Sequence, residues 1–456
     1  MRARRMRTAL GCIYPFSVKR ELRMLGRAEY LAKEDLLSLQ EDRLKRLLQH
    51  AYTNVPYYRR AMDETGLLKN NSDDLLDENN FSKFPFLTKE ILRIHQSDLI
   101  SKDIRKRKFY YNTSGGSTGE PVRFIQDLEY KHWVRGASLL YDRWTGYNPG
   151  MPKIILWGSE RDFLEGRERP LARLKSSLKN EVLLNTFTMS ETHMHQYVEA
   201  INHLKPVQIL AYVESIYELA RFIEKKSLMV YSPKVIMTSA GTLYPNMRQI
   251  IERVFRAPVF NRYGSREVGA IACECGVHQG LHVSPLNNYI EIIREDGSLA
   301  APGEVGEIVV TCLANYAMPL IRYRIGDLGV WAEEECSCGR KWPLLKEVSG
   351  RINSIIKTKN GVYDSTALTT SFYFKDEKKT QTFMSFSRYQ LVQKALDRFV
   401  LRVVVQDSKL WKKERESLKM NLIKILGEDI DIHLEEVDEI APSPSGKHLY
   451  ILSELT

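Results

Sequence analysis

The middle of the chain alternates short apolar runs with longer amphipathic ones, and this alternation limits the fold more than any other feature. The short runs have the length of strands, and the longer runs repeat apolar residues at helical spacing. Alternating strands and helices bury their apolar faces when the helices cover a mainly parallel sheet. We therefore predict an α/β fold with mainly parallel sheets. The strand-like runs are 153–157, 207–211 and 235–237, and the helical runs are 194–204 and 215–225.

The sequence on either side of this region has a different character. Residues 20–65 repeat leucines at helical spacing and are interrupted at Pro56, so we expect a helical opening. The polar stretch 70–80 is expected to be a surface loop. Residues 288–335 contain further strand-like runs, with a turn at 295–297.

Chain length and the pattern at its end predict two domains. At 456 residues the chain is longer than one ordinary compact core allows. After residue 350 the order becomes strand, helix and strand, which is typical of a small α+β domain. We predict a large N-terminal domain over 1–349, a hinge near 350–353 and a small C-terminal domain over 354–456. The elements expected in the small domain are 399–405, 408–425 and 431–437.

Composition narrows the class of protein. The chain is 43% hydrophobic and 27% charged, as globular proteins are, and it contains no apolar run long enough to span a bilayer. The net charge of +10 is dispersed and has no interleaved aromatic platform. We therefore expect neither a nucleic-acid partner nor a transmembrane segment. The basic start, 1–16, is expected to be a solvated tail, with contact to acidic lipid or a partner as the alternative.

Residues 111–121 read Tyr-Asn-Thr-Ser-Gly-Gly-Ser-Thr-Gly-Glu-Pro and form the strongest local motif. Glycines allow tight bends that expose backbone amides, and the hydroxyls add donors, so the loop suits phosphate oxygens. It is not a Walker sequence, because no Gly-Lys-Ser/Thr closes it and Glu120 stands where a lysine would be. Taken alone, the motif also fits a plain flexible loop.

Four further motifs follow this loop in a fixed order. The ordered set resembles the adenylate-forming superfamily and, within it, the phenylacetate-CoA ligase branch with its CapK-like members linked to capsular polysaccharide biosynthesis. The end of the helical opening, residues 49–58, is typical of the same branch, so the resemblance spans nearly the whole chain. The four motifs are Asn261-Arg-Tyr-Gly-Ser-Arg-Glu267, Ile321-Arg-Tyr-Arg-Ile-Gly-Asp327, Gly350-Arg351 and Ser443-Pro-Ser-Gly-Lys447.

The resemblance implies an ATP site. The loop would hold the β- and γ-phosphates, and two short segments would flank the adenine, with Tyr263 offering a stacking face. Asp327 would accept hydrogen bonds from both ribose hydroxyls, because an ionised carboxylate only accepts. The implied nucleotide-binding residues are Thr113, Ser114, Gly115, Gly116, Ser117, Thr118, Gly119, Ser239, Ala240, Gly241, Tyr263, Gly264, Ser265 and Asp327.

The resemblance also implies three catalytic residues. Glu267 would bind Mg²⁺, which offsets the charge of the phosphates. Arg351 would contact the α-phosphate or the ribose, and Lys447 would stabilise charge as the carboxylate attacks the α-phosphate. One departure stands out: family members commonly carry an acidic pair after the hinge Gly-Arg, where this chain has Ile352-Asn353-Ser354. That change puts the domain rotation for the second half-reaction in question.

The cysteines predict a metal site. Four of the six cysteines form two Cys-x-Cys pairs, and no secretory signal precedes them. In a reducing compartment such pairs indicate metal ligands rather than disulfides. Buried free thiols are the alternative, and Cys273 and His278 are competing ligands. The resembled branch implies a structural Zn²⁺ site formed by Cys275, His282, Cys336 and Cys338.

These inferences combine into one predicted activity. ATP would activate a small carboxylic acid as an acyl-adenylate, and the acyl group would pass to coenzyme A. One alternative acceptor is an amine of a polysaccharide or amino-sugar precursor. A second alternative is a non-catalytic nucleotide-binding partner in polysaccharide assembly.

The sequence leaves the acid, the acceptor and the oligomeric state open, a homodimer included. Residues near strand ends after the loop are the candidates for the acid pocket: His132, Trp133, Trp157 and Tyr212. We expect a cytoplasmic protein, and a peripheral position at the membrane stays open.

Overall fold

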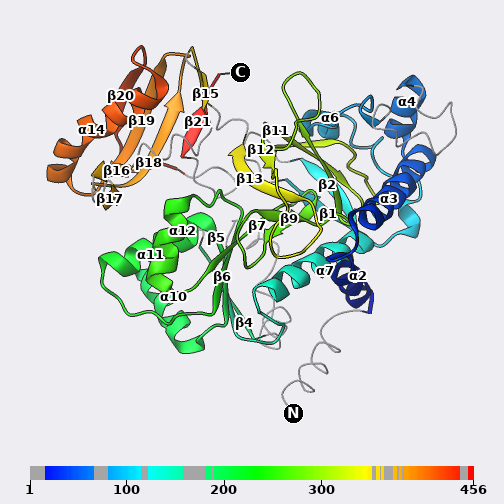
Figure 1. Cartoon of the computed structure of the whole chain (residues 1–456), viewed down its shortest axis with the longest axis horizontal. Coiled ribbons are helices and arrows are strands. Elements are labelled where there is room, and N and C mark those ends of the chain that lie inside the picture. The colour runs from blue at the N-terminus through cyan, green and yellow to red at the C-terminus, as the bar shows by residue number, and fades with distance from the viewer. Residues whose placement is uncertain are drawn as a thin grey trace. The chain divides into compact units, whose positions relative to one another are not determined.

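The chain forms two units, each with its own hydrophobic core, in the computed structural model (Figure 1). The large unit comprises Met1–Ile325 and Gly329–Val348, and the small unit comprises Gly326–Leu328 and Ser349–Thr456. The residues that the structure describes are 16–65, 81–114, 122–157, 180–186, 189–351, 356–359, 361–363, 373–376, 379–382, 385–441 and 450–455.

Helices open the large unit, as predicted. They are α2 (Phe16–Ala28), α3 (Lys33–Asn54) and α4 (Pro56–Thr65), and the break between α3 and α4 falls at the predicted proline. Helix α2 packs along α7 (Leu128–Trp144) (Figure 1). A Cβ at Gly136 of α7 would stand 3.1 Å from Glu21 Cβ, so the close approach of the two helices depends on a glycine. The expected loop at 70–80 lies outside the described residues.

The large unit is organised on an eleven-stranded sheet, ordered β10-β11-β12-β13-β9-β8-β7-β6-β5-β3-β4. The strands are β3 (Lys153–Leu156), β4 (Glu181–Leu184), β5 (Gln208–Tyr212), β6 (Val235–Ser239), β7 (Val259–Ser265), β8 (Gly269–Glu274), β9 (Leu281–Val283), β10 (Asn288–Ile293), β11 (Val305–Cys312), β12 (Tyr323–Trp331) and β13 (Leu344–Arg351).

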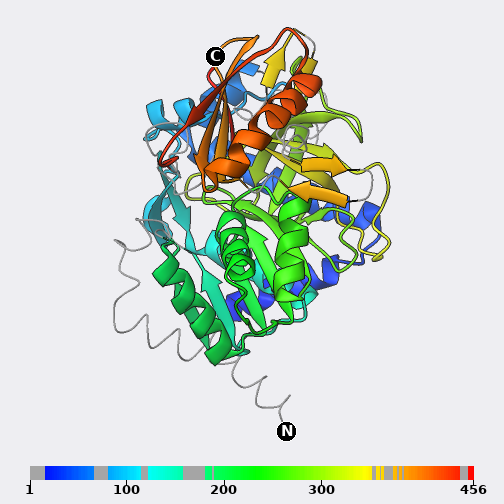
Figure 2. The same ribbon diagram turned by 90° about the vertical axis from the view of Figure 1, so that its left-hand side faces the viewer.

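The half of the sheet from β4 to β7 is parallel, as the alternating sequence predicted. The helices that connect these strands lie together on one face of the sheet (Figures 1 and 2). Two of them begin at a local signal: the Ser190 hydroxyl accepts from His193 N at the start of α10, and Pro245 begins α12. The connecting helices are α10 (Glu191–Leu204), α11 (Val213–Lys225) and α12 (Pro245–Phe255).

The half of the sheet beyond β7 is antiparallel in its described pairings, so the sheet is mixed rather than mainly parallel. Strands β7, β8 and β9 pair antiparallel in succession, and β13 pairs antiparallel with β9. The physical reason lies in the connections. Parallel neighbours need a long crossover, whereas β7 and β8 are separated only by residues 266–268.

A separate two-stranded hairpin precedes this sheet in the chain. Strands β1 (Phe109–Thr113) and β2 (Arg123–Asp127) pair antiparallel and enclose the residues of the Ser/Gly/Thr motif. Asp127 then caps α7 by accepting from Tyr130 N. Two short helices lie before the hairpin, α6 (Lys89–Ile94) and η2 (Ile104–Lys106).

The buried side chain of Arg322, the residue before β12, forms an ion pair with β10 and hydrogen bonds with the segment before α6. Arg322, only 1% exposed, donates to both carboxylate oxygens of Glu291 and to the carbonyls of Ser82 and Phe84. Its backbone lies at φ 48°, an uncommon value for a bulky residue. These contacts position the strand that carries Asp327.

The small unit is a four-stranded sheet ordered β20-β19-β18-β21, with helix α14 packed against it (Figure 1). Three of its elements match the predicted strand, helix and strand, whereas β18 and β21 were not predicted. The elements are β14 (Ile356–Thr358), β15 (Gly361–Tyr363), β16 (Tyr373–Asp376), β17 (Lys379–Thr382), β18 (Phe386–Gln393), β19 (Arg398–Val405), α14 (Ser408–Leu426), β20 (Asp431–Glu436) and β21 (Ile451–Ser453).

Candidate active site and metal-ligand cluster

The base of the Ser/Gly/Thr loop is closed by hydrogen bonds. Ser114 N donates to the carbonyl of Val122 at 2.8 Å, and Val122 N donates to Ser114 Oγ at 2.9 Å. The hydroxyl oxygen of Thr113 is buried and has no hydrogen-bond partner among the described residues. A buried hydroxyl without a partner is costly, so this position favours a ligand that supplies one. Gly115 to Gly119 lie outside the described residues.

Glu267 lies in the tight turn between β7 and β8 and is 6% exposed. The turn is closed by Val268 N, which donates to Ser265 Oγ, and by Gly269, whose φ is 77°. Gln126 reaches the same turn from β2, and its side-chain amide donates to the carbonyls of Arg266 and Glu267 at 2.7 and 3.0 Å. The predicted Mg²⁺ ligand and the predicted phosphate loop are therefore joined to one hairpin.

The segments expected to flank the adenine follow β6 and end β7. Ser239 is the last residue of β6, and Ala240 has a left-handed φ of 70°. A Cβ at Gly241 would stand 2.3 Å from Glu214 Oε1, and one at Gly264 would stand 2.4 Å from the carbonyl oxygen of Gly269. A glycine is therefore required at Gly264, where the neighbour is backbone, whereas a Cβ at Gly241 would only displace the end of the Glu214 side chain.

The rings of Trp157 and Tyr212, two of the four pocket candidates, contact each other at a tilt of 38°. Their ring centroids lie 4.1 Å apart at the carboxyl ends of β3 and β5, the edge where ligands bind in open α/β sheets. The other two candidates contact the N-terminal helices instead. His132 lies 3.3 Å from Ser17 Oγ, and the Trp133 ring packs under the Arg43 guanidinium.

The remaining predicted residues come from the last part of the chain. Asp327 lies within β12 and is partly exposed. Arg351 ends β13, and its side chain is outside the described part of the structure. Lys447 and the hinge residues 352–353 also lie outside the described residues, so their roles stay predictions.

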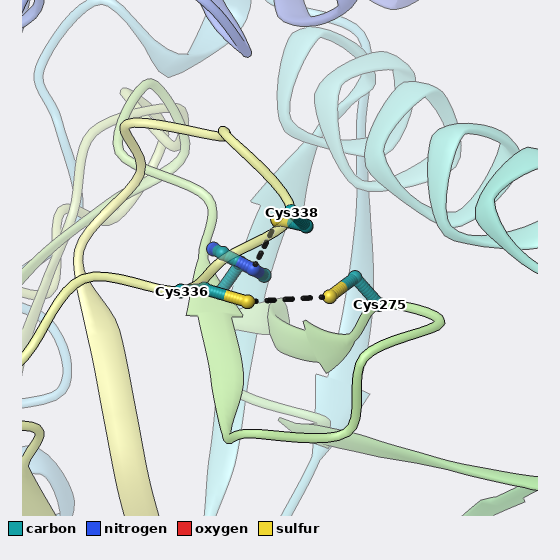
Figure 3. A group of neighbouring side chains, drawn as sticks. Cys275, Cys336 and Cys338 are labelled. Carbon is teal, nitrogen blue, oxygen red and sulfur yellow. Dashed lines mark hydrogen bonds between the residues drawn. The ribbon is translucent and has the colours of Figure 1, made fainter.

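The predicted metal ligands form one compact cluster. The ligand atoms of Cys275, His282, Cys336 and Cys338 all lie within 4.8 Å of one another, and three of these residues are buried. Cys275 Sγ is 3.6 Å from Cys336 Sγ, and Cys338 Sγ is 3.3 Å from His282 Nε2. Figure 3 shows the three cysteine side chains converging.

This cluster fits a tetrahedral zinc ion. With Zn–S bonds of about 2.3 Å, neighbouring sulfurs of a tetrahedral site lie about 3.8 Å apart, close to the separation seen here. Burial lowers the pKa of His282 to about 4, so its imidazole is neutral and able to bind a metal at neutral pH. Three thiols and one imidazole are the donor set that zinc prefers in structural sites.

The two competing ligands have other partners. Cys273 is fully buried in the main core, and His278 Nδ1 lies 3.0 Å from Glu274 Oε2. The cluster also contacts the end of α2, because Trp342 Nε1 donates to the Ala28 carbonyl and Arg340 Nε to Glu29. A metal here would join β8, β9 and the segment 332–343 near the N-terminal helices.

Neither Gln126 nor Asn112 was singled out from the sequence. Gln126 is 1% exposed and lies on β2, where every residue after Arg123 is buried. A polar residue in the middle of a buried strand was the available signal, because such a side chain needs a specific partner.

The fold is that of the adenylate-forming ligases. A solved structure of 2-hydroxyisobutyryl-CoA ligase, in the postadenylation state with an acyl-AMP ligand, matches with a TM-score of 0.74 at 18% identity, covering 94% of this chain and 92% of that one. The family model described as the CapK C-terminal domain matches residues 379–454.

Two curated relatives refine the comparison. The chain is 24% identical to Protein CapK of Staphylococcus aureus, over 92% of this chain and 90% of the relative. It is 28% identical to the phenylacetate-coenzyme A ligase of Thermus thermophilus, over 72% and 73% respectively. The resemblance drawn from the ordered motifs, to adenylate-forming enzymes and to their phenylacetate-CoA ligase and CapK branch, is confirmed. Among the described residues, none of the helices is both long and apolar enough to cross a membrane.

Proposed function

We propose that the protein is a ligase that activates a carboxylic acid with ATP. The observation that carries the proposal is that the base of the Ser/Gly/Thr loop and the Glu267 turn are both held by the hairpin β1–β2. A phosphate-binding loop and a carboxylate for a divalent cation are the two parts that an ATP site needs to be held together. The relatives, which are ligases of the adenylate-forming class, support the same activity.

In the first half-reaction the carboxylate of the acid attacks the α-phosphorus of ATP. A bond forms between the carboxylate oxygen and the α-phosphorus. The bond from the α-phosphorus to the pyrophosphate oxygen breaks, giving acyl-AMP and pyrophosphate. Thr113 and Ser114 would bind the departing phosphates with the loop from Gly115 to Gly119. Mg²⁺ bound by Glu267 would offset their charge. Lys447 would stabilise the charge that develops at the α-phosphate.

The nucleoside would be held by the segments around it. Ser239, Ala240 and Gly241 would flank the adenine on one side, and Tyr263, Gly264 and Ser265 on the other. Asp327 would accept from the ribose hydroxyls, and Arg351 would contact the α-phosphate or the ribose. The contacting pair Trp157 and Tyr212 is the part of the predicted acid pocket that lies at the ligand-binding edge of the sheet.

In the second half-reaction an acceptor attacks the acyl carbonyl and AMP departs. Coenzyme A is the proposed acceptor, so the thiol loses its proton, a thioester forms and the acyl–phosphate bond breaks. Two relatives that are coenzyme A ligases support this choice. The similarity to CapK keeps an amine of a polysaccharide precursor as the second candidate acceptor. We propose that the small domain, 354–456, rotates about a hinge near 350–353 between the half-reactions.

The metal-ligand cluster is proposed to bind structural Zn²⁺. Its four ligands leave no open position for a substrate, and the nearby Trp342 donates to the Ala28 carbonyl at the end of α2. The metal would therefore stabilise the fold and take no part in the reaction.

The outward face of α2 supports a peripheral position of this cytoplasmic enzyme at an anionic membrane. Phe16, Arg20, Arg23, Met24 and Arg27 are all exposed and recur at helical spacing. We expect the protein to sediment with phosphatidylserine vesicles, and an Arg23→Glu, Arg27→Glu variant to stay in solution. Equal recovery of both proteins with phosphatidylserine vesicles would contradict the proposal, as would equal recovery of the wild-type protein with neutral phosphatidylcholine vesicles.

The activity is tested by pyrophosphate release from the full-length protein. A panel of aryl, hydroxy and amino acids is supplied with Mg·ATP, with coenzyme A, with an amine, or with neither. We expect acid-dependent pyrophosphate release, and a thioester when coenzyme A is present. Amide formation would favour the amine acceptor instead. ATP binding in calorimetry without pyrophosphate release for any acid would indicate the non-catalytic partner.

A further inference from the structure

Two side-chain amides, those of Asn112 and Gln126, connect the start of the phosphate loop to the turn that carries Glu267. Gln126 Nε2 donates to the carbonyl oxygens of Arg266 and Glu267, at 2.7 and 3.0 Å. The side-chain oxygen of Gln126, Oε1, accepts from Asn112 Nδ2 at 3.0 Å. Asn112 Oδ1 in turn accepts from the backbone N–H of Thr113 at 2.9 Å. We call these two residues the amide pair.

The register of the hairpin places the amide pair on one face. Gln126 lies opposite Tyr110, and Asn112 lies opposite Phe124, so the two side chains are diagonal neighbours. Gln126 is 1% exposed, and burial makes each of its polar contacts costly to lose. Both ends of its amide are satisfied: the nitrogen by the carbonyls of Arg266 and Glu267, and the oxygen by Asn112, the residue before Thr113.

The contacts of Gln126 constrain the backbone of the turn directly. One amide nitrogen binds two successive carbonyl oxygens, so it restricts the rotation of two peptide planes next to Glu267. Helix α7 closes the turn from another side, because a Cβ at Gly269 would stand 2.4 Å from Val134 Cγ2. With both peptide planes fixed, the direction in which the Glu267 Cα–Cβ bond leaves the backbone is set before any ligand binds.

We propose that Gln126 is a positioning residue for Mg·ATP, which fixes the Glu267 carboxylate relative to the phosphate loop through Asn112. This inference rests on the proposed function, in which Glu267 binds the cation and the loop binds the phosphates. A cation that bridges a carboxylate and phosphate oxygens tolerates little error in their separation, since Mg²⁺ requires near-ideal octahedral geometry. The amide pair supplies that fixed separation.

The test is the Mg²⁺ dependence of ATP binding to the full-length protein. Calorimetry gives the dissociation constant of ATP with excess Mg²⁺ and with EDTA, and their ratio is the enhancement due to the cation. Gln126→Met keeps the side-chain length but removes both donors. We expect it to lower the enhancement about tenfold, as the loss of buried hydrogen bonds implies, with little change in ATP binding in EDTA.

A matched control separates positioning from general loss of packing. Gln208 is also fully buried and uses its side-chain amide once, to Thr145 Oγ1 at 3.1 Å, at the other end of the parallel strands. Gln208→Met should lower the melting temperature by an amount similar to that of Gln126→Met. It should leave the Mg²⁺ enhancement of ATP binding within about twofold of wild type. Equal loss of enhancement in both variants would overturn the inference.

Two further variants complete the test. Glu267→Gln should abolish the enhancement; if it does not, the Mg²⁺ role of Glu267 in the proposed function fails. If Glu267→Gln abolishes it and Gln126→Met retains it, only the positioning role of Gln126 fails. If Gln126→Met does not fold, Asn112→Val replaces it in the test, because Asn112 is less buried. We expect Asn112→Val to lower the Mg²⁺ enhancement about threefold. An unchanged enhancement in that variant would overturn the inference as well.

Discussion

The two ends of strand β8 carry opposite kinds of site. Glu267 lies just before the strand, in a turn held by hydrogen bonds from the Gln126 side-chain amide to backbone carbonyls. Cys275 lies just after the strand, which ends at Glu274. The first site presents one hard oxygen ligand, which suits Mg²⁺ shared with a substrate. The second collects a full set of soft ligands from separate segments, which suits a permanently bound metal. One strand thus separates a site proposed to act in chemistry from a site proposed to act in folding.

The sharpest test of this contrast removes one ligand of the cluster. Cys338→Ser should lose bound zinc and about 4 kcal/mol or more of unfolding free energy, because structural metal contributes directly to folding. Elemental analysis and chemical denaturation measure the two quantities. Cys312→Ser, at a buried free thiol outside the cluster, should keep the zinc. Wild-type protein purified without chelator that contains no zinc would remove the metal site.

The converse test removes the charge of Lys447, which is proposed to act in catalysis and not in folding. Lys447→Ala should slow acyl-adenylate formation by about 10²- to 10³-fold, the usual cost of losing one positioned donor to a transition state. Transfer from a supplied acyl-adenylate and the melting temperature should change little. Pyrophosphate release and single-turnover transfer measure the two half-reactions. Equal loss in both would point to misfolding, and loss in neither would exclude Lys447 from the site.

A substitution at the proposed ribose contact should have a smaller effect. Asp327→Asn replaces one accepting oxygen by an amide that donates toward a hydroxyl. Hydrogen bonds to charged groups are worth about 1.5–3 kcal/mol, so ATP affinity should fall by roughly one to two decades. Calorimetry gives the affinity, and circular dichroism should be unchanged. An unaltered affinity would mean that this motif does not bind ribose.

Glu274 ends β8, directly before Cys275, and its substitution should give the smallest effect. Its carboxylate accepts from Asn261 N of β7 and from Arg248, and it pairs with His278 beyond Cys275. Burial alone would raise the pKa of Glu274, but these partners outweigh it and the pKa is lowered. We expect Glu274→Gln to cost about 1–2 kcal/mol of unfolding free energy at neutral pH.

The pH dependence of that cost has a definite sign. A carboxyl with a lowered folded-state pKa stabilises the protein above its unfolded pKa of about 4.3, and this contribution is lost as pH falls through the folded value. The difference between wild type and Glu274→Gln should therefore shrink below about pH 4. Denaturation midpoints across the pH range provide the measurement, and a constant difference would contradict the assignment.

The helices and strands that could be predicted are those with a local sequence pattern of their own. The helical opening with its break at Pro56, the parallel strands with their helices, and three elements of the small domain follow from periodicity and breaker residues alone. The antiparallel half of the sheet was less readable, because neighbours there pair across turns as well as across distant segments, such as β9 with β13. Strand β21 of the small domain has only three residues, too few for a periodic signal.

The sequence by itself determined which chemical groups this protein carries and in what order: a hydroxyl and glycine loop, two separated carboxylates, and a set of thiols and histidines. Only the tertiary structure brought the thiol of Cys275, rather than that of Cys273, together with the other three predicted ligands, and it alone brought Gln126 to the Glu267 turn. The physical reason is that periodicity reports the surroundings of a residue along its own element. Which side chains meet across elements is set by strand order and helix packing, and these depend on the whole core.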